Sequence, residues 1–280
     1  MSKFTGYKCS LCGAEYLPGQ VTYTCPRDGG NLDVVLDYDS IRKKFQPEDV
    51  ISRKRPSLWR YLPLLPVSEP AGDSTPLHAA GWTPVFARLA DQIGLKHLWL
   101  KDESRNPTAS FKDRASAVVV TRARELKSEV VVTASTGNAG AALAGMSAAV
   151  GQKAVIFAPK SAPQAKVAQL LVFGAKVILV DGTYDDAFDL TVKAAEEFGW
   201  YCRNTGYNPF TAEGKRPPLL RSGSGGWTRT ATGTRRTARW TTIRRLPFLF
   251  RWAMGISFRA SIRVLRTCWR WGGSPTCRAS

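Results

Sequence analysis

The stretch VVVTASTGNAG, residues 130–140, decides the fold class of this chain. Its first four residues are all β-branched, which is typical of a strand in a parallel sheet that is covered on both faces. Small and polar residues follow, and they lead into an alanine-rich segment that predicts a helix over residues 138–150. A buried strand that passes directly into a helix indicates an α/β protein.

The alternation of strand and helix continues on both sides of this stretch. The pattern predicts helices over residues 86–92, 112–126, 138–150, 163–173 and 184–198, and strands over residues 97–101, 129–133, 153–158, 176–180 and 200–203. Residues 40–80 predict only short helices and proline-rich connections. The expected fold is therefore an α/β fold with a doubly wound parallel sheet, in which ligands bind at the carboxyl ends of the strands.

The polar residues after the strand over residues 129–133 are candidates for binding an anion. Ser135, Thr136 and Asn138 add side-chain donors to the backbone N–H groups at the start of the helix, and Gly137 lets a ligand approach the backbone closely. This arrangement suits a carboxylate, a phosphate or a phenolate oxygen. The alternative is that these residues only cap the helix over residues 138–150.

A second strand-to-helix junction carries a lysine. Ser110 is expected to be the N-cap, with Asp113 three residues later as a variant of the capping box, and this places Lys112 in the first turn. The positive field of a helix N-terminus disfavours a cation, so the pKa of this lysine should be lowered and its amine should be a better nucleophile. The alternative is a surface lysine that reaches past the turn.

A cysteine-containing segment precedes the α/β region. Cys9 and Cys12 are separated by two residues, and Cys25 and Asp28 repeat this spacing twelve residues later. Such turns can direct paired ligands at one metal ion, so residues 1–38 predict a zinc-ribbon-like segment. Three cysteines and one aspartate are an uncommon set for structural zinc, so a ribbon without metal is the alternative. A redox-active cysteine pair is disfavoured because it does not follow a strand in a βαβ pattern.

The charge of the chain is concentrated at its C-terminal end. The full chain has a net charge of +18, but residues 1–216 account for only +5. Residues 217–280 contain 13 Arg and no Lys, Asp or Glu. A basic composition suggests a nucleic-acid partner, whereas charge placed this unevenly marks a boundary between segments. We expect a ribbon-like segment over residues 1–38, an incomplete α/β region over residues 39–216 and an aberrant tail over residues 217–280.

The tail also lacks Asn, Gln, His and Tyr, so every residue type whose codon has adenine in the second position is missing. No property of proteins selects this set, whereas a G+C-rich gene that is read out of frame would produce it. In the shifted frame, residues 251–259 permit Val-Gly-Asp-Gly-Asn-Ile-Ile-Ser, a glycine-rich sequence that can hold a phosphate. We therefore expect that a frameshift near Pro217 produced the tail. The alternative is a genuine Arg- and Trp-rich arm that binds nucleic acid or anionic lipid.

Several short motifs occur in the order and spacing of a known family. They are LKDE, NPT, SFKDR, STGN, NTGYNPF and EGK, at residues 100–103, 106–108, 110–114, 135–138, 204–210 and 213–215. With these motifs the chain resembles the fold-type II family of pyridoxal-phosphate enzymes, and within it the threonine synthases, some of which also carry an N-terminal cysteine-containing ribbon. The resemblance covers about residues 5–216. Ala109 and Arg105 depart from the pattern where glycine-like residues are common.

The resemblance implies a role for each matched residue. Lys112 matches the lysine that binds the cofactor, pyridoxal 5'-phosphate, as a Schiff base, and Asn138 matches the asparagine that hydrogen-bonds the ring hydroxyl of the cofactor. Ser135, Thr136 and Gly137 match the loop that receives the substrate carboxylate. The positions where the family has residues for the substrate phosphate and the pocket are Lys101, Ser110, Asn204 and Asn208.

The implied reaction converts O-phospho-L-homoserine and water to L-threonine and phosphate, a step of threonine biosynthesis. Cysteate synthase and threonine or serine dehydratase share the lysine and the Ser-Thr-Gly-Asn element, and they are the alternatives. The cofactor-phosphate loop and the hydroxyl group that pairs with the pyridine nitrogen in this family are not found in residues 217–280, so we expect the chain as written to be inactive. The absent leader and the reduced-looking cysteines predict a cytoplasmic protein. We expect neither a membrane partner nor a nucleic-acid partner, and the oligomeric state stays open.

Overall fold

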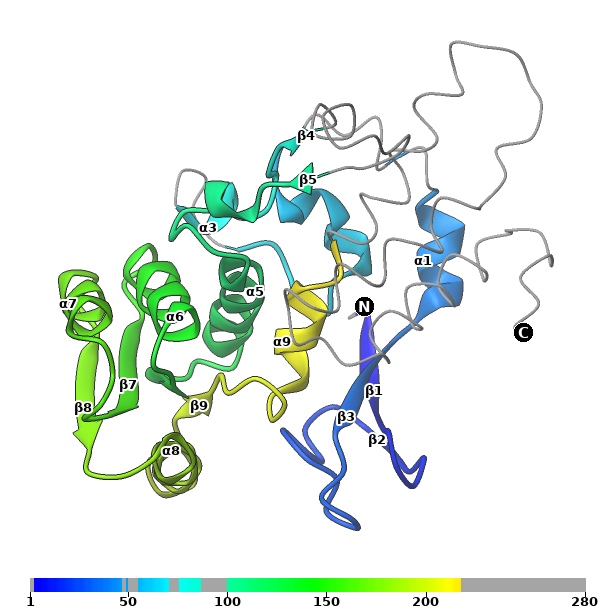
Figure 1. Cartoon of the computed structure of the whole chain (residues 1–280). Helices are drawn as coiled ribbons and strands as arrows, with labels where there is room; N and C mark the ends of the chain where they lie inside the picture. Colours follow the sequence, from blue (N-terminus) through cyan, green and yellow to red (C-terminus); the bar gives the residue numbers. More distant parts are fainter. Residues whose placement is uncertain (1–2, 47–48, 50–54, 71–75, 87–99, 218–280) are drawn as a thin grey trace, which may run out of the picture. The chain divides into compact units, whose positions relative to one another are not determined.

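The structure, a computed structural model, describes residues 3–46, 49, 55–70, 76–86 and 100–217. Within these residues the strands form a three-stranded antiparallel sheet, a two-stranded sheet and a four-stranded parallel sheet (Figure 1). Of the predicted tail, only Pro217 belongs to the described residues, and residues 218–280 lie outside them.

The four-stranded parallel sheet confirms the predicted fold class. Its strands follow the order β8-β7-β6-β9, and every neighbouring pair is parallel. The strands are β6 (Val130–Ala134), β7 (Lys153–Pro159), β8 (Lys176–Val180) and β9 (Tyr201–Cys202). All five residues of β6 are buried, as its continuous run of β-branched residues predicts.

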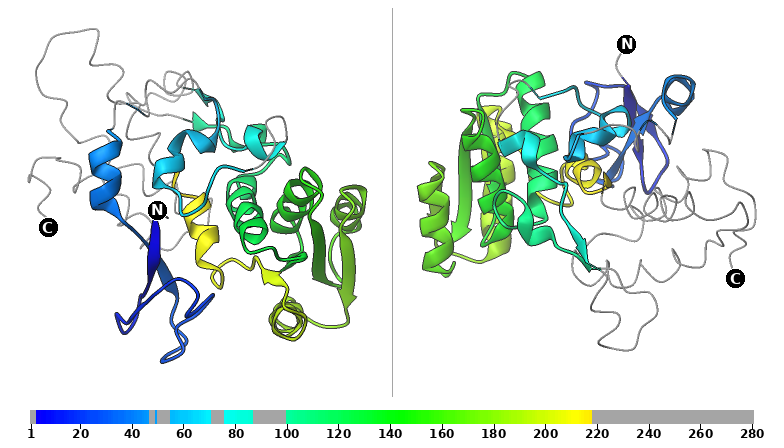
Figure 2. Two further views of the ribbon diagram at one scale, coloured as in Figure 1. Left: turned by 180° about the vertical axis from the view of Figure 1, so that it is seen from behind. Right: turned by 90° about the horizontal axis from the view of Figure 1, so that it is seen from above.

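Helices follow the strands in the predicted order. They are α5 (Lys112–Glu125), α6 (Asn138–Ala148), α7 (Gln164–Val172), α8 (Tyr184–Phe198) and α9 (Pro209–Gly214). Helices α5, α6 and α7 lie side by side in a row, which Figure 2 shows from behind. Helix α8 packs against alternate residues of β6 and β7, so these residues and their neighbours face opposite sides of the sheet. The sheet is therefore covered on both faces, which is the doubly wound arrangement.

The core between α8 and the sheet is built from small and β-branched side chains. Val132 and Phe157 pack against Ala187 and Ala195, and Cys202 of β9 belongs to the same cluster. Because alanines on the helix face the larger residues on the strands, the helix axis can approach the sheet closely. Each fully buried valine or phenylalanine contributes roughly 1.5–3 kcal/mol through the hydrophobic effect.

The N-terminal segment forms the antiparallel sheet β2-β1-β3. Its strands are β1 (Phe4–Cys9), β2 (Glu15–Tyr16) and β3 (Leu32–Leu36). One face of β1 packs on α9, where the rings of Phe4 and Tyr7 meet Phe210 edge-on with centroids 5.5 Å and 6.4 Å apart. The guanidinium of Arg122, on α5, lies over the rings of Phe4 and Phe210. The ribbon therefore contacts α5, which precedes the parallel sheet in the sequence, and α9, which follows it.

The connecting region contains short elements, as its prolines predict. They are α1 (Tyr38–Lys44), a 3₁₀ helix (Leu58–Leu64), α3 (Pro76–Ala79), β4 (Val85–Phe86), β5 (Leu100–Lys101) and a 3₁₀ turn (Glu103–Arg105). The prediction of a helix that begins at residue 86 is wrong at its start, because Phe86 pairs with Leu100 in the antiparallel sheet. Residues 87–92 of that helix and residues 97–99 of the predicted strand lie outside the described residues. None of the described helices is long and apolar enough to cross a membrane.

Helix α9 lies unusually close to α5. A Cβ atom added to Gly214 would lie 2.7 Å from the Cα of Ala115, which is closer than real Cβ contacts allow. Only glycine fits at this position, because any side chain would push α9 away from the helix that begins with Lys112.

Candidate active site

The first candidate residue, Lys112, opens helix α5. The N-cap of this helix is Phe111 and not the predicted Ser110, although the hydroxyl of Ser110 accepts a hydrogen bond from the backbone N–H of Lys112 at 3.2 Å. The preceding residue, Ala109, has a φ of 56°, a left-handed conformation that favours glycine. The chain is thus turned sharply just before the lysine, at a position where the family pattern also favours a glycine-like residue.

Asp113 holds the turn in a way that the sequence did not predict. Its carboxylate accepts hydrogen bonds from the backbone N–H of Thr108, at 2.6 Å, and from the hydroxyl of Thr108. The predicted capping box, in which Asp113 reaches back to Ser110, is therefore wrong, because the left-handed turn at Ala109 brings Thr108 nearer. Asp113 is fully buried, and burial raises the pKa of its carboxyl group.

The electrostatic surroundings of Lys112 favour its neutral amine. Lys112 is partly buried, and its pKa is lowered first by burial and then by the charge of Arg203. The guanidinium of Arg203 donates to Ser116 Oγ at 3.3 Å and to Thr205 Oγ1 at 2.9 Å. Its Nη2 atom is buried without a hydrogen-bond partner among the described residues. A buried N–H donor that lacks a protein partner is suited to an anionic ligand.

Lys215 adds a third cation to this neighbourhood. It is 8% exposed, and burial, together with the charges of Arg203 and Lys112, lowers its pKa to about 7. The charge of Arg203 lowers the pKa of both lysines, and the charge of Lys112 also lowers that of Lys215. Cations placed this close together indicate a site for an anion, because a bound negative charge would relieve their repulsion. The sequence analysis assigned no role to Arg203 or Lys215. Two features of the sequence could have indicated them: Arg203 is a charged residue at the end of an apolar strand, and Lys215 belongs to the EGK motif.

The second predicted junction, residues 135–138, starts helix α6. The hydroxyl of Ser135 accepts hydrogen bonds from the N–H groups of Gly137, at 3.1 Å, and Gly140, at 2.8 Å. Thr136 and Asn138 are exposed, and Asn138 Oδ1 accepts a hydrogen bond from Lys166 Nζ at 2.9 Å. Ser135 therefore shapes the loop, while Thr136 and Asn138 are presented to solvent at the helix N-terminus.

Asn204 is held at the carboxyl end of β6, next to this loop. Its Oδ1 atom accepts hydrogen bonds from Thr133 Oγ1 at 3.0 Å and from the backbone N–H of Ala134 at 2.8 Å. Its Nδ2 atom is buried and has no hydrogen-bond partner in the part of the chain that the structure describes. Asn204 and Arg203 thus place two such donors side by side in sequence, at the end of β9.

Asn208 has a structural role in α9. Its Oδ1 atom accepts a hydrogen bond from Phe210 N at 2.9 Å, and its Nδ2 donates to the carbonyl of Cys202 at 2.7 Å. Both polar atoms of this side chain therefore have protein partners, so Asn208 fixes the turn between β9 and α9. Its predicted contact with substrate stays a prediction.

Lys101 also has close protein partners. Its ammonium group donates to the hydroxyl and the carbonyl of Thr83 and lies 3.2 Å from Glu103 Oε1. Glu103 in turn accepts two hydrogen bonds from the buried guanidinium of Arg114, at 2.7 Å and 2.9 Å. The LKDE and SFKDR motifs are thus joined by an ion-pair network. Burial raises the pKa of Glu103, but the hydrogen bonds and charges of Arg114 and Lys101 outweigh this effect and lower it. The predicted contact of Lys101 with a substrate phosphate stays a prediction.

The residues around Lys112 fit the expected cofactor. Pyridoxal 5'-phosphate carries an aldehyde, a phosphate and a ring hydroxyl. The site offers an amine with a lowered pKa, further cations and two buried N–H donors that have no hydrogen-bond partner within the described parts of the chain. The N-terminus of α6 adds backbone N–H groups to this set. The donor set therefore matches an anionic aldehyde.

The predicted metal ligands of the ribbon also come together. Cys9, Cys12, Cys25 and Asp28 each offer one ligand atom, and these atoms all lie within 4.8 Å of one another.

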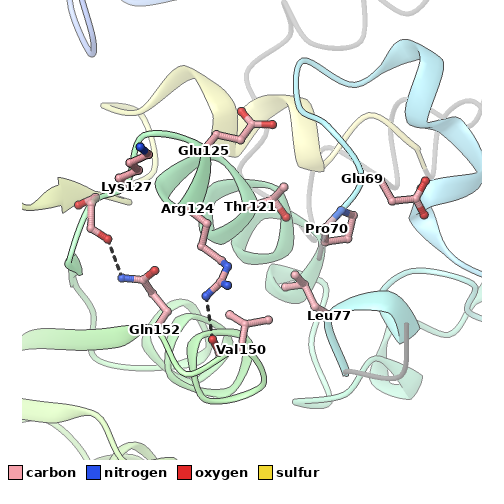
Figure 3. A pocket seen from close by; sticks show the side chains of 10 residues that line it. Glu69, Pro70, Leu77, Thr121, Arg124, Glu125, Lys127, Val150 and Gln152 are labelled. Atoms are coloured by element: carbon pink, nitrogen blue, oxygen red, sulfur yellow. Dashed lines mark hydrogen bonds between the residues drawn. The ribbon is translucent and has the colours of Figure 1, made fainter. Parts of the chain in front are cut away.

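A separate surface pocket of about 420 Å³ lies at the opposite end of α5. Figure 3 shows the residues that line it, including Arg124, which donates to the carbonyl of Val150 at 2.8 Å, and Gln152. No predicted site residue lines it, and its location at the C-terminus of α5 separates it from Lys112 at the N-terminus.

Comparison with known proteins assigns the α/β region to a family. The family model of pyridoxal-phosphate dependent enzymes matches residues 77–217. Threonine synthase of Methanocaldococcus jannaschii is 40% identical over 212 residues, which cover 75% of this chain and 51% of that protein. Threonine synthase of Methanosarcina acetivorans is 42% identical over 213 residues, which cover 75% of this chain and 50% of that protein. The chain thus spans about half the length of these curated relatives.

Among solved structures, the apo form of diaminopropionate ammonia lyase from Escherichia coli aligns with a TM-score of 0.47 and 26% identity. The alignment covers 59% of this chain and 50% of that chain.

Proposed function

Because the chain belongs to the family of pyridoxal-phosphate dependent enzymes, we propose that its α/β region carries the lysine-bearing half of a threonine synthase active site. The substrate would be O-phospho-L-homoserine, and the products would be L-threonine and phosphate. The observation that carries the proposal is the position of Lys112 in the first turn of α5, with a pKa that burial and Arg203 lower. The four cysteines that the structure describes are free thiols, which supports a cytoplasmic location.

Lys112, Thr136 and Asn138 would each have a separate role in this reaction. The amine of Lys112 is more often neutral than that of an ordinary lysine, so it can bind the cofactor aldehyde and later accept or return protons at the carbon atoms of the substrate. Pyridoxal phosphate, when bound, supplies an electron sink for the carbon next to the substrate amine. Thr136 and the N–H groups at the start of α6 would bind the substrate carboxylate, and Asn138 would orient the ring hydroxyl of the cofactor.

Arg203 and Asn204, which follow β9, and Lys215, at the end of α9, would bind a phosphate group. Arg203 Nη2 and Asn204 Nδ2 are buried donors without protein partners among the described residues, and Lys215 lies close enough to be affected by the charges of Arg203 and Lys112. A dianionic phosphate would pair with all of them and would raise the lowered pKa of Lys215.

The test is to identify the lysine that captures the cofactor. The full 280-residue chain is mixed with pyridoxal 5'-phosphate, reduced with borohydride, digested and analysed by mass spectrometry. We expect the label on Lys112 and its loss in Lys112→Arg, whereas Lys127→Arg, at the other end of α5, should keep it. A label spread over surface lysines would overturn the proposal.

Product analysis then separates threonine synthase from related lyases. Phosphate release from phosphohomoserine supports threonine synthase, whereas turnover of phosphoserine supports a cysteate synthase. We expect no turnover by the chain as written, because residues 217–280 do not contain the family's remaining cofactor contacts.

A frameshift origin of the tail can be tested on the gene. The match to the family model ends at residue 217, where the composition changes, and this supports the proposal. The gene should be sequenced from codon 205 to well past codon 280 and compared with the source DNA. One base lost or gained near codon 216 would confirm the frameshift, and an unchanged frame would overturn it.

A further inference from the structure

The N-terminal ribbon gathers four potential metal ligands on two turns. Cys9 ends β1 and Cys12 lies in the turn that follows, while Cys25 and Asp28 lie in the turn that leads towards β3. Cys9 and Cys25 are buried, and Cys12 and Asp28 are exposed. The cluster lies outside the site that contains Lys112, and the proposed reaction makes no use of it.

The separations of two pairs of ligand residues, Cys12 with Cys25 and Cys9 with Asp28, are close to the edges of a tetrahedral zinc site. With Zn–S bonds of about 2.3 Å and Zn–O bonds of about 2.1 Å, a tetrahedron has S–S edges of about 3.8 Å and S–O edges of about 3.6 Å. The Sγ atoms of Cys12 and Cys25 are 3.7 Å apart. The Sγ atom of Cys9 lies 3.4 Å and 3.5 Å from the two carboxylate oxygens of Asp28. A Cys12–Cys25 disulfide would need a much shorter separation, about 2.05 Å.

The atoms around the cluster favour ionised ligands. The backbone N–H of Leu11 donates to Cys9 Sγ at 3.3 Å, and that of Gly30 donates to Asp28 Oδ1 at 2.8 Å. A Cβ atom added to Gly30 would lie 2.9 Å from Cys9 Sγ and 2.8 Å from Asp28 Oδ1, so a larger residue would fill the space around the ligands. Hydrogen bonds of this kind orient the ligands of a metal ion.

We propose that Cys9, Cys12, Cys25 and Asp28 bind one structural zinc ion. Thiolates select soft or borderline cations, and tetrahedral geometry with no open position is typical of structural zinc. Calcium and magnesium prefer six or more oxygen ligands, which three sulfur atoms and one carboxylate do not provide.

The zinc would also stabilise the contact between the ribbon and the active-site segment. Tyr23 belongs to the loop between the two ligand pairs, and its hydroxyl accepts a hydrogen bond from the backbone N–H of Cys202 at 2.8 Å. Its ring stacks on Tyr207 with centroids 4.6 Å apart. Cys202 ends β9, two residues before Asn204. Fixing both ends of this loop would therefore hold Tyr23 against β9, the strand that directly precedes Arg203 and Asn204.

The first experiment measures metal in the full chain. Protein purified under reducing conditions from medium with zinc is dialysed, and zinc and iron are measured by inductively coupled plasma mass spectrometry. We expect one zinc per chain, retained through dialysis, and Co(II) in its place should give the absorption of a tetrahedral thiolate site. Absence of zinc, iron in its place, or a Cys12–Cys25 disulfide that persists in reductant would each overturn the proposal.

Variants then assign the ligands. Zinc affinity, measured by competition with a chromophoric chelator, should fall in Cys12→Ser and in Asp28→Ala by more than the 10–100-fold typical of losing an outer-shell partner. Asp28→Cys should bind zinc at least as tightly as the parent chain, because it completes four thiolates. Matched controls are Glu15→Gln in the same ribbon and the double variant Cys268→Ser/Cys277→Ser in the tail, and both should leave affinity unchanged. Equal affinity in all variants would overturn the assignment.

A measurement on the unmodified chain covers the case in which a variant fails to fold. In the zinc-loaded protein, Cys9, Cys12 and Cys25 should resist alkylation by iodoacetamide and become reactive when a chelator is added. Equal alkylation of exposed Cys12 with and without zinc would contradict the proposal. Because these measurements involve neither pyridoxal phosphate nor Lys112, their outcome is independent of the proposed function.

Discussion

The two helices that begin at the candidate site start in different ways. Helix α5 begins after a left-handed turn at Ala109, is held by the fully buried Asp113 and opens with a lysine. Helix α6 begins directly after a buried strand, is shaped by the hydroxyl of Ser135 and carries no charged residue in its first turn. Both therefore point a positive helix end at the site, but only α5 adds a cation to that end.

This difference shows how one fold can separate two tasks. The start of α5 uses buried charge and a sharp turn to hold one reactive side chain in place. The start of α6 leaves backbone N–H groups and two exposed polar side chains, Thr136 and Asn138, available to a ligand. We therefore expect the loss of buried charged groups around α5 to change stability and pH dependence strongly, and the loss of the Ser135 hydroxyl at α6 to have a smaller effect.

The largest expected effect comes from removing Asp113. In Asp113→Ala, the N–H and hydroxyl groups of Thr108 lose a buried acceptor, and we expect the free energy of unfolding to fall by about 3 kcal/mol. Urea denaturation followed by tryptophan fluorescence measures the change. The exposed Asp189 on α8 provides a control, and Asp189→Ala should change stability by less than about 0.5 kcal/mol. Equal losses in the two variants would contradict the special role of the α5 junction.

The second prediction concerns the cations near Lys112. The pKa of Lys215 is lowered to about 7 in the folded chain, so between pH 7 and the ordinary lysine pKa of 10.5 the unfolded chain binds more protons. Stability therefore rises with pH in this window, by about 1.4 kcal/mol per pH unit for a single group. The cost of burying the charged lysine is fully present below pH 7.

The contribution of Lys215 is isolated by difference. Urea denaturation between pH 7.5 and 9 should show a slope against pH that is smaller by about 1.4 kcal/mol per unit in Lys215→Met than in the parent chain. Tyrosines and cysteines that titrate in the same range contribute equally to both proteins. Parallel curves for the two proteins would show that Lys215 is not desolvated in the folded state.

The third prediction concerns Ser135 at the start of α6. Ser135→Ala removes the acceptor for the N–H groups of Gly137 and Gly140, and we expect a loss of about 1 kcal/mol, as for other capping residues. Thr136→Ala, at the neighbouring exposed position, should change stability by less than about 0.5 kcal/mol. Thermal unfolding by circular dichroism distinguishes the two. A Thr136 effect as large as that of Ser135 would show that the loop is packed rather than open.

The smallest effect should come from Ala109. Its left-handed φ costs roughly 1–2 kcal/mol, and glycine removes this cost but adds roughly 0.5–1 kcal/mol of chain entropy. We therefore expect Ala109→Gly to stabilise the protein by about 0.5 kcal/mol in urea denaturation. Ala148→Gly, at the helical end of α6, should destabilise it instead. The same sign for both substitutions would show that the left-handed conformation of Ala109 carries no measurable cost.

The parallel sheet could be predicted because its residues repeat a simple pattern. The strand over residues 176–180 and the helix over residues 184–198 have the predicted bounds, since apolar runs and helical periodicity are properties of short segments. Phe86 was misassigned because its pairing with Leu100 depends on a segment fourteen residues away. Periodicity within one segment does not contain that information.

The candidate site was only partly predictable. The order of the motifs predicted Lys112, Ser135 and Asn204 as site residues. In the structure Lys112 lies at the N-terminus of α5, and Ser135 and Asn204 lie at the carboxyl end of β6, where parallel sheets bind ligands. The sequence did not indicate that Asp113 would bind Thr108, because a single left-handed residue between them redirects the chain. Arg203 and Lys215 were missed as site residues because burial of a charge depends on packing between distant segments.

The close packing of α9 on α5 has a consequence for the order of events during synthesis. Lys112 leaves the ribosome 102 residues before Gly214, the residue that lets α9 settle against its helix. At about 5–20 residues per second, this interval lasts roughly 5–20 s. During that time α5 lacks the helix that packs against it at Gly214. Arg203, whose charge lowers the pKa of Lys112 in the folded chain, is also made 91 residues after the lysine.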